Sequence, residues 1–470
     1  MAKSGRRIED ARHLAPDQSD TLTDLKAIGQ LPVTLQGQAL ELAIRIGDSL
    51  QSSGQSVNDT VVVIRRVCLA YGLRRINVDI TYTAIVASYY PGGGLNPVTA
   101  MRTVKLASPN LTKITALNKL VRDIEAGEPL EVALTRFDKL HEAPPPYPRW
   151  LATLGNSAIG MAVQLFYTTS PVVLVVALVM GIGLNRLLYF LARRSMPPFF
   201  QQLMGAWLIV AVTALTAWLG KFDPTGIFHG LNPTLIAVGG IVQLVAGMKF
   251  VAAGQDAIDG FYVTATARLL QVVMLTAGIV AGLVIGLKVV VRLGIYIHIS
   301  PDPISLGPVP GQYAAAILAA VFFTIGTFAN WRIIGLAAAG ATLAWLGFRV
   351  SSAVISGPVF ADFVGALLAA FVVTMLVRRS LLPGFAIVNG AILALVPGMR
   401  VFRGLLQIVG TNFETPSPSE GGATLLVAVG VALAIAAGAS LGMYLGRPVG
   451  DRLMGPPLEW YDNLRHRGRG

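Results

Sequence analysis

The chain has 470 residues, of which 54% are hydrophobic and only 13% are charged, and its formal net charge at pH 7 is +12. A soluble protein carries about 25% charged residues, so this composition excludes an ordinary soluble protein and indicates a membrane protein with several helical spans. The positive charge fits Lys and Arg retained in cytoplasmic loops better than nucleic-acid binding, and the single cysteine, Cys68, excludes an internal disulfide.

Residues 1–150 have the composition of a soluble region. Residues 1–34 are polar and contain no signal peptide, so we expect a disordered tail on the cytoplasmic side of the membrane. Residues 35–142 are predicted to form a small cytoplasmic α+β domain. Its expected helices are 35–51, a helix from the capping box of Ser56 and Asp59 to Gly72, 111–126 and 130–141, and its expected strands are 75–81, 84–90 and 102–107.

Polar motifs in this region have ordinary explanations. The glycine-rich loop Pro91–Gly94 is not followed by a helix with a phosphate-binding lysine, so it is interpreted as a simple loop. Asp138 and His141 lie three residues apart without a third ligand nearby, and neither a metal nor another cofactor is expected. A proline-rich linker at 143–150 ends at Trp150, an expected anchor at the membrane interface.

Residues 151–446 are mostly apolar and are predicted to cross the membrane ten times. The expected spans are 151–168, 172–191, 202–220, 231–249, 266–290, 311–330, 332–349, 360–377, 384–399 and 423–446. The distribution of Lys and Arg favours a cytoplasmic amino terminus only slightly, so this orientation rests mainly on the soluble region. We expect the carboxyl terminus, with a basic tail at 447–470, to be cytoplasmic as well.

Three segments of the first half of the membrane part match segments of the second half. The matched pairs are Pro198–Trp207 with Pro358–Leu367, Leu244–Lys249 (LVAGMK) with Leu395–Arg400 (LVPGMR), and Gly278, Gly282 and Gly286 with Gly438, Gly442 and Gly446. Each half, 151–300 and 301–446, holds five spans, so the second half enters the membrane in the opposite orientation. The sequence therefore predicts a 5+5 inverted repeat, as in many secondary transporters, with glycine stripes that allow close helix packing.

The fourth and ninth spans are interrupted by glycine or proline, which is the best sequence pointer to a transporter's binding site. Half-helix amino ends at Gly240, Gly247, Gly390 and Gly398 would present amides to a carboxylate, and a kink at Pro397 would leave carbonyls for an ammonium group. Polar side chains in these spans face either a cavity or a neighbouring helix. The candidate substrate-binding residues are Gly240, Gln243, Gly247, Asn389, Pro397, Gly398, Gln202 and Asn156.

Charged groups close to these spans are candidates for proton coupling or gating. Asp256 and Asp259 follow the fourth span, Arg268 begins the fifth and Asp362 lies in the eighth. Because desolvation favours the neutral form of a carboxyl group, a partly buried aspartate here would be able to carry a proton. The alternative for Asp256 and Asp259 is a solvated cytoplasmic turn with an ion pair to Arg268.

At these residues the chain resembles the bacterial threonine/serine exporter family in its fused two-repeat form. The similarity covers about residues 35–446 and is carried by Ser52–Leu73, by PPFFQQLMGA, by GGIVQLVAGMKFVAAGQDAIDGFYVTATARLL and by PGFAIVNGAILALVPGMRVFRGL. Where the family commonly has a proline before the glycine of the first broken span, this chain has Ala246, whereas Pro397 is present in the second. The resemblance implies ten spans, a cytoplasmic amino-terminal domain and efflux of threonine and serine driven by the proton motive force.

Three functions are compared. The leading one is an antiporter in the bacterial plasma membrane that alternates access around broken helices 4 and 9 and whose partners are lipid, a small amino acid and protons; a homo-oligomer is left open. The second is a dicarboxylate or organic-acid exporter, because a split form of the architecture is associated with dicarboxylate export. The third is a membrane-bound hydrolase, against which stands the absence of a G-x-S-x-G elbow and of paired catalytic carboxylates. No nucleotide-binding P-loop motif is present, so an internal ATPase is not indicated.

Overall fold

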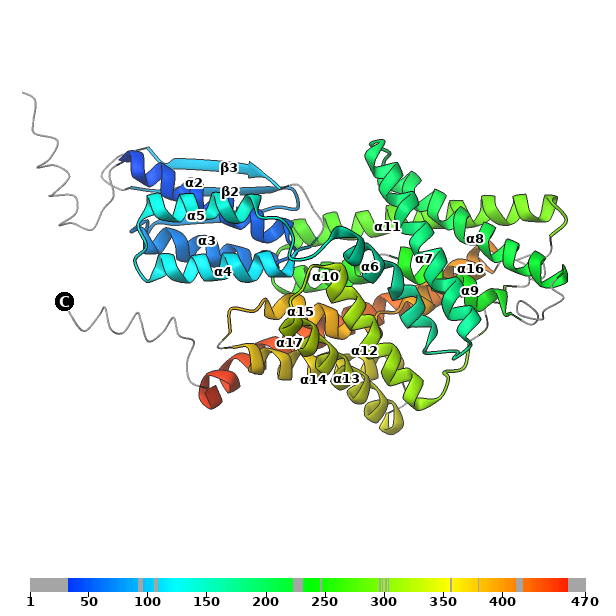
Figure 1. Ribbon diagram of the computed structural model, residues 1–470. Helices are drawn as coiled ribbons and strands as arrows, with labels where there is room; N and C mark the ends of the chain where they lie inside the picture. Colours follow the sequence, from blue (N-terminus) through cyan, green and yellow to red (C-terminus); the bar gives the residue numbers. More distant parts are fainter. Residues whose placement is uncertain are drawn as a thin grey trace, which may run out of the picture.

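A computed structural model of the chain shows a mostly helical protein with two parts, an amino-terminal unit (residues 33–142) stacked on one end of a helical bundle (residues 149–454) (Figure 1). The structure describes residues 33–91, 96–104, 109–222, 231–245, 247–295, 297, 299–300, 302, 304–355, 357–378, 380–410 and 417–454. The predicted tail at 1–34 lies outside these residues except for its last two positions, as do the glycines at 92–94 and the part of the basic tail beyond 454.

The amino-terminal unit consists of four helices and an antiparallel three-stranded sheet. Its elements are α2 (Val33–Ser52), α3 (Val57–Ala70), β1 (Ile76–Ile80), β2 (Ala84–Tyr89), β3 (Val98–Thr103), α4 (Leu111–Glu125) and α5 (Leu130–Glu142). Alternate residues of the central strand β2, namely Ile85, Ala87 and Tyr89, are buried, and the strand packs against α2. This burial pattern places one face of the sheet on the helices.

Local signals in the sequence determine several of these boundaries. The hydroxyl of Ser56 accepts a hydrogen bond from the Asp59 amide (3.1 Å) and so caps α3 as the capping box predicts. Gly72, which follows that helix, has φ +80°, the left-handed conformation expected of a helix-ending glycine. The predicted third strand at 102–107 starts too late, because pairing with β2 places β3 at Val98–Thr103, where Ala84 pairs with Thr103 and Tyr89 pairs with Val98. Residues 105–107 of that prediction lie outside the described residues.

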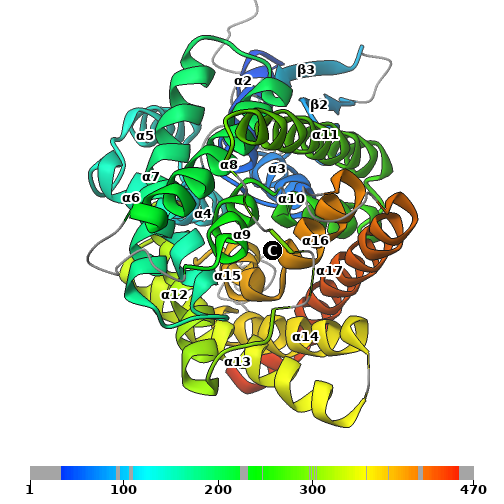
Figure 2. The same cartoon turned by 90° about the vertical axis from the view of Figure 1, so that its right-hand side faces the viewer.

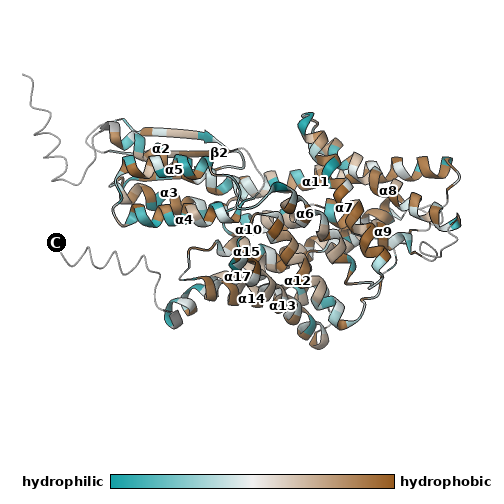
Figure 3. Ribbon diagram, viewed as in Figure 1, coloured by the Kyte–Doolittle hydropathy of each residue, from teal (hydrophilic) through white to brown (hydrophobic). Residues whose placement is uncertain are grey.

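The bundle consists of the remaining elements. They are α6 (Arg149–Gln164), α7 (Pro171–Arg193), α8 (Pro198–Phe222), α9 (Pro233–Leu244), α10 (Gly247–Ile258), α11 (Tyr262–Arg292), α12 (Val309–Gly326), α13 (Trp331–Val354), α14 (Pro358–Val377), α15 (Gly384–Ala391), the 3₁₀ helix η1 (Ile392–Leu395), α16 (Gly398–Val409) and α17 (Pro418–Met454). Figure 3 shows apolar residues dominating this bundle, whereas hydrophilic and hydrophobic residues are mixed along the helices and strands of the amino-terminal unit.

The length and composition of these helices indicate a polytopic membrane protein. Among the described residues, seven helices are long and apolar enough to cross a membrane, and there are up to nine spans if each of two bent helix pairs counts as one. The predicted first span, 151–168, corresponds to α6, which has only 16 residues. The total of ten spans therefore stays a prediction.

The two bent pairs correspond to the fourth and ninth predicted spans. The chain bends by 41° between α9 and α10 and by 51° between α15–η1 and α16. Viewed from the end of the bundle, α9, α15 and α16 lie at its centre and the long helices surround them (Figure 2). The breaks in the helices therefore lie inside the bundle.

Glycine stripes bring two helix pairs into backbone contact. A Cβ atom on Gly282 of α11 would meet the Leu203 carbonyl oxygen of α8 at 2.2 Å. In the same way, a Cβ on Gly438 of α17 would meet the Phe363 carbonyl oxygen of α14 at 2.3 Å. Larger residues at these glycines would push the helices apart. A spacing of four residues places the glycines on one face of each helix, so both stripes allow the close approach.

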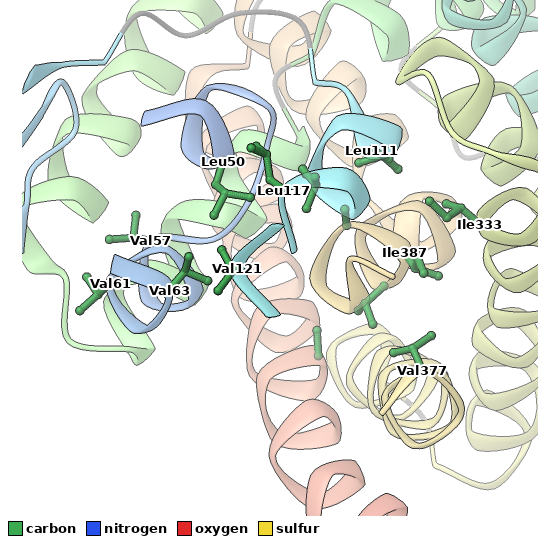
Figure 4. Packing of buried hydrophobic residues seen from close by; sticks show 14 of the residues in the cluster. Leu50, Val57, Val61, Val63, Leu111, Leu117, Val121, Ile333, Val377 and Ile387 are labelled. Carbon is green, nitrogen blue, oxygen red and sulfur yellow. The ribbon is translucent and has the colours of Figure 1, made fainter. Parts of the chain in front are cut away.

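The amino-terminal unit is joined to the bundle by a shared core and by hydrogen bonds. Buried side chains of α2–α4 and of α13–α15 belong to one hydrophobic cluster, and Figure 4 draws Leu111 and Val121 of the unit together with Ile387 of the bundle as members of it. The amide of Leu111 also donates to the Thr327 carbonyl oxygen (2.9 Å), and Asn118 Nδ2 donates to the Leu381 carbonyl oxygen (3.2 Å). The two parts therefore pack as one body in this conformation.

Candidate functional site

A cavity of about 580 Å³, here called the central cavity, lies where the two bent pairs meet. It is lined by the first turns of α10 and α16, including Lys249 and Arg400, and by the residues just before the two breaks. Small-molecule sites usually have volumes of about 300–1,000 Å³, so this cavity is large enough for an amino acid or a small organic acid. The amino ends of two helices also carry partial positive charge, which favours an anionic group.

Two glycines allow the two bent helix pairs to pack closely at their breaks. A Cβ atom on Gly247, the first residue of α10, would meet Val396 Cγ1 at 2.3 Å, and one on Gly398, the first residue of α16, would meet Val242 Cγ1 at 3.0 Å. Each helix start therefore contacts the opposite bent pair. This arrangement explains why both predicted half-helix ends are glycines.

One buried ion pair dominates the charge of the central cavity. Asp362, on α14, has a side chain only 3% exposed, and its Oδ2 lies 3.2 Å from Nη1 of Arg400. Lys249 and Arg403 are also part of the lining. The lining thus holds three cationic side chains and one carboxylate, a balance that suits a ligand with a carboxylate group.

Polar side chains of the lining offer hydrogen-bond acceptors as well. Gln243 Nε2 donates to the Asn156 carbonyl oxygen (3.0 Å), which fixes the orientation of the Gln243 side chain. The Oε1 atoms of Gln202 and Gln243 are buried and have no hydrogen-bond partner within the described residues. Buried acceptors are normally satisfied, so these two oxygens are well suited to receive a donor from a ligand.

An aromatic group forms an apolar wall of the cavity. The rings of Phe166 and Trp345 have their centroids 4.5 Å apart, and those of Trp345 and Phe348 are 5.0 Å apart. An apolar wall lowers the local dielectric constant, which strengthens the interaction between a bound charge and its partners.

The structure brings together most of the predicted substrate-binding residues. Asn156, Gln202, Gln243, Pro397 and Gly398 line the central cavity, as does Asp362 from the predicted coupling set. Gly247 adjoins it through its contact with Val396.

Other predicted positions lie elsewhere. Gly240 is inside α9, where a Cβ would meet Ile209 and Met180, and Gly390 is inside α15 near Thr324. The expectation of half-helix amino ends at these two glycines is therefore wrong, because the helices break four or five residues later, after Leu244 and Leu395. Asn389 also lies on α15, and its buried Oδ1 has no hydrogen-bond partner in the described part of the chain.

The remaining predicted coupling residues form a separate group at the amino-terminal unit. Asp256 of α10 and Arg268 of α11 approach to 3.1 Å, so the ion pair of the alternative is present. The Asp256 side chain is only 6% exposed, however, and does not lie in a solvated turn. Close by, Thr264 Oγ1 donates to the Ile80 carbonyl oxygen (3.4 Å). Asp259 follows α10, and burial, together with the nearby carboxylate of Asp59, raises the pKa of its carboxyl group.

Sequence reasoning missed the cationic lining residues. Lys249 and Arg400 are the last residues of the matched segments LVAGMK and LVPGMR, which were interpreted only through their glycines. Gln202 and Asp362 also occupy matched positions, in Pro198–Trp207 and Pro358–Leu367. A comparison of all matched polar positions would have found four lining residues together.

Asp138 and His141 take part in contacts within the amino-terminal unit. Asp138 Oδ1 lies 2.5 Å from Nη2 of Arg45, and His141 Nδ1 lies 3.3 Å from the hydroxyl of Ser49. Burial and the positive charge of Lys113 lower the pKa of His141. Ser49 is 2% exposed, so its contact with His141 links α2 to α5 inside the unit.

Comparisons with known proteins agree with this architecture. Family models described as "Putative threonine/serine exporter" and "Threonine/Serine exporter, ThrE" match residues 41–290 and 312–444. A Mycobacterium tuberculosis protein named "Probable threonine/serine exporter" is 34% identical over 438 residues, which cover 89% of this chain and 80% of that protein. The "Threonine/serine exporter" of Corynebacterium glutamicum is 31% identical over 430 residues, which cover 89% and 83%. No solved structure matches the chain significantly.

Proposed function

The chain belongs to the threonine/serine exporter family, and from that premise we propose that it exports small polar amino acids such as threonine and serine in exchange for protons. The observation that carries the proposal is the central cavity, in which two helix breaks meet around the buried pair of Asp362 and Arg400. We place the protein in the bacterial plasma membrane with both termini in the cytoplasm.

A zwitterionic amino acid fits this cavity by insertion between the two charges. The α-carboxylate would bind the guanidinium of Arg400, with Lys249 and the amino ends of α10 and α16 adding positive potential. The α-ammonium group would bind Asp362 and the unpartnered oxygens of Gln202 and Gln243. The substrate carboxylate then replaces Asp362 as the partner of Arg400, and the ammonium group replaces Arg400 as the partner of Asp362.

The same geometry supports proton exchange at Asp362. The substrate ammonium and a proton both need the carboxylate of Asp362, so the cavity holds one or the other. A proton that enters from outside neutralises Asp362 and removes the main partner of the ammonium group. The substrate then leaves, and release of the proton to the cytoplasm restores the pair with Arg400.

We propose that alternating access arises from a 5+5 inverted repeat. Two matched pairs of positions, Gln202 with Asp362 and Lys249 with Arg400, all line the central cavity, which supports a pseudo-twofold axis through it. Rocking of one set of helices against the other would then expose the cavity to each side in turn.

Reconstitution tests the proposal. Proteoliposomes loaded with labelled L-threonine should release it several times faster when the outside is acidic and more slowly after a protonophore is added. The matched control is Asp138→Asn, which removes an ion pair with Arg45 far from the cavity and should leave the rate unchanged. A release rate that does not respond to the proton gradient would defeat the coupling mechanism.

The cationic excess of the lining specifically favours a second candidate, export of organic acids. Three cations face one carboxylate, which would also hold a dicarboxylate such as succinate. A competition experiment separates the two candidates. At an amino-acid site, unlabelled serine should displace labelled threonine, whereas succinate should not. Stronger displacement by succinate would make the protein an organic-acid exporter.

A further inference from the structure

A second cavity, here called the seam cavity, lies between the amino-terminal unit and the bundle. Its volume is about 330 Å³, and its lining comes from α3 and α4 on one side and from α14, α17 and the residues 380–385 on the other. Both parts of the molecule are therefore needed to form it. Val63 and Val121 from the unit and Val377 from the bundle are part of its apolar lining, and Figure 4 shows all three.

Two polar atoms of this lining have no partner in the described chain. Thr374 of α14 is 8% exposed and its Oγ1 makes no hydrogen bond with the described residues. Other buried threonines of the bundle behave differently, because Thr213 and Thr324 donate to the carbonyl oxygen four residues earlier in their helices. Gln55 Oε1, on the opposite wall, is likewise buried and unpartnered within the described residues.

The charged side chains that line the seam cavity differ in how closely they are paired. Arg66 binds Glu125 through two bonds of 2.6 Å, and Arg378 binds Asp451 through bonds of 2.7 and 3.2 Å. Asp59 of α3 and Arg447 of α17 also face each other, but their closest atoms are 3.8 Å apart, longer than a hydrogen bond. Burial raises the pKa of Asp59 despite the positive charge of Arg447, and Asp259 adds a further negative charge near this pair.

We propose that the seam cavity is a second binding site for a zwitterionic α-amino acid. Gln55 Nε2 donates to Asp59 Oδ2 (3.2 Å), which places the unpartnered Gln55 Oε1 and the Asp59 carboxylate on the same wall. An ammonium group supplies three donors for these acceptors. The α-carboxylate reaches Arg447 on the other wall and accepts a hydrogen bond from Thr374. A simple anion would leave the two acceptors unsatisfied, and a simple cation would leave Arg447 unsatisfied.

Occupancy of this site can be communicated to the transport site through one helix. α14 carries Thr374 in the seam cavity and Asp362 in the central cavity, about 18 Å apart along the helix axis. A bound amino acid joins Asp59 of the amino-terminal unit to Arg447 of α17, and α17 packs along α14. The inference goes beyond the transport site, and only the expected count of two threonine sites rests on the proposed amino-acid cargo.

Equilibrium binding to the full chain in lipid nanodiscs tests the inference. Labelled L-threonine should bind at two sites per chain in the wild type and at one in Asp362→Asn. Asp59→Asn should weaken the other site by about tenfold or more, since a charged hydrogen bond contributes roughly 1.5–3 kcal/mol. Thr374→Val should weaken it about threefold to tenfold.

Controls separate a lost site from a damaged protein. Thr342→Val removes a hydroxyl that bonds its own helix at Ala338, so both sites should keep their affinity in this variant. Threoninol, which lacks the carboxylate, and N-acetylthreonine, which lacks the ammonium group, should not bind at the seam. If Asp59→Asn does not fold, Thr374→Val decides the question.

The inference is overturned if the wild type binds one threonine that Asp362→Asn abolishes, or if Thr374→Val binds like the wild type at both sites. These results are distinct from a failure of the transport proposal, in which threonine still binds at the seam while export does not respond to the proton gradient.

Discussion

Gln202 and Lys249 in the first half of the bundle match Asp362 and Arg400 in the second half, and all four residues line the central cavity. The two halves therefore place side chains at corresponding positions around one space while differing in charge. The second half contributes a buried ion pair at 3.2 Å, whereas the first contributes a neutral amide and an exposed lysine. Positions that match in the sequence thus carry unequal chemistry.

Under the proposed mechanism, this difference assigns proton coupling to the second half. A neutral glutamine cannot exchange a proton, so among these four positions only the second half offers a carboxylate, together with a rigid, planar cation. The first half supplies acceptors and diffuse positive potential. Each of the following variants alters one half and is compared with the corresponding variant in the other.

The largest expected effect is that of Asp362→Asn. Gradient-driven efflux should fall by about 100-fold or more, because removing one member of a buried ion pair costs roughly 3–5 kcal/mol and removes the proton site. Gln202→Ala, the matched variant, should lower efflux only about threefold to tenfold, since it removes a single neutral acceptor. Efflux from proteoliposomes measures both. Equal losses would show that the two halves contribute equally and would sink the assignment of the proton to Asp362.

Replacing the cation of the second half, Arg400, should also impair transport more than replacing its match in the first half, Lys249. Arg400→Gln should raise the threonine concentration for half-maximal efflux by roughly 10- to 100-fold, because it removes a charge-assisted bond to the substrate carboxylate in a largely buried setting. Lys249→Gln should raise it by about threefold, since exposed charges are screened by solvent. Concentration dependence of efflux in the two variants gives the comparison. A larger effect at Lys249 would place the carboxylate at the first break.

The helix starts offer a steric version of this test. Gly247→Ala should reduce efflux by about tenfold, because the added Cβ would lie 2.3 Å from Val396 Cγ1 and overpacking costs roughly 1–3 kcal/mol. Gly398→Ala should reduce it by about threefold or less, since its Cβ meets Val242 Cγ1 at 3.0 Å. Initial efflux rates at matched protein content measure both variants. If Gly398→Ala proves more harmful, the second break is the tighter one during transport.

Much of the fold could be predicted because its signals are local. Apolar runs place most of the long helices within a few residues, and the capping Ser56 and the left-handed Gly72 mark the two ends of α3. The position of β3 could not be predicted in this way, because its ends are set by pairing with β2 and not by its own residues. The continuation of the broken spans into α10 and α16 also depends on packing between distant segments.

The site was only partly predictable for a related reason. Glycine and proline marked the two breaks, and polarity inside a span marked Gln202, Gln243 and Asp362. The sequence could not show that Arg400 folds back onto Asp362, because the two residues lie on different helices that meet only in the bundle. An ion pair of Asp256 with Arg268 was one alternative from the sequence, but the sequence could not show that this pair is buried and lies away from the cavity.

Asp256→Asn should have the smallest effect on transport. Asp256 pairs with Arg268 between α10 and α11 and is not part of the lining of the central cavity, so efflux should stay within about threefold of the wild type. The variant should instead unfold at a lower temperature, because Arg268, with a side chain 17% exposed, loses its partner. Efflux and thermal unfolding of the same preparation measure the two effects separately. Loss of gradient-driven efflux with retained threonine binding would move the proton site to Asp256 and make the first half, not the second, the one that couples transport to protons.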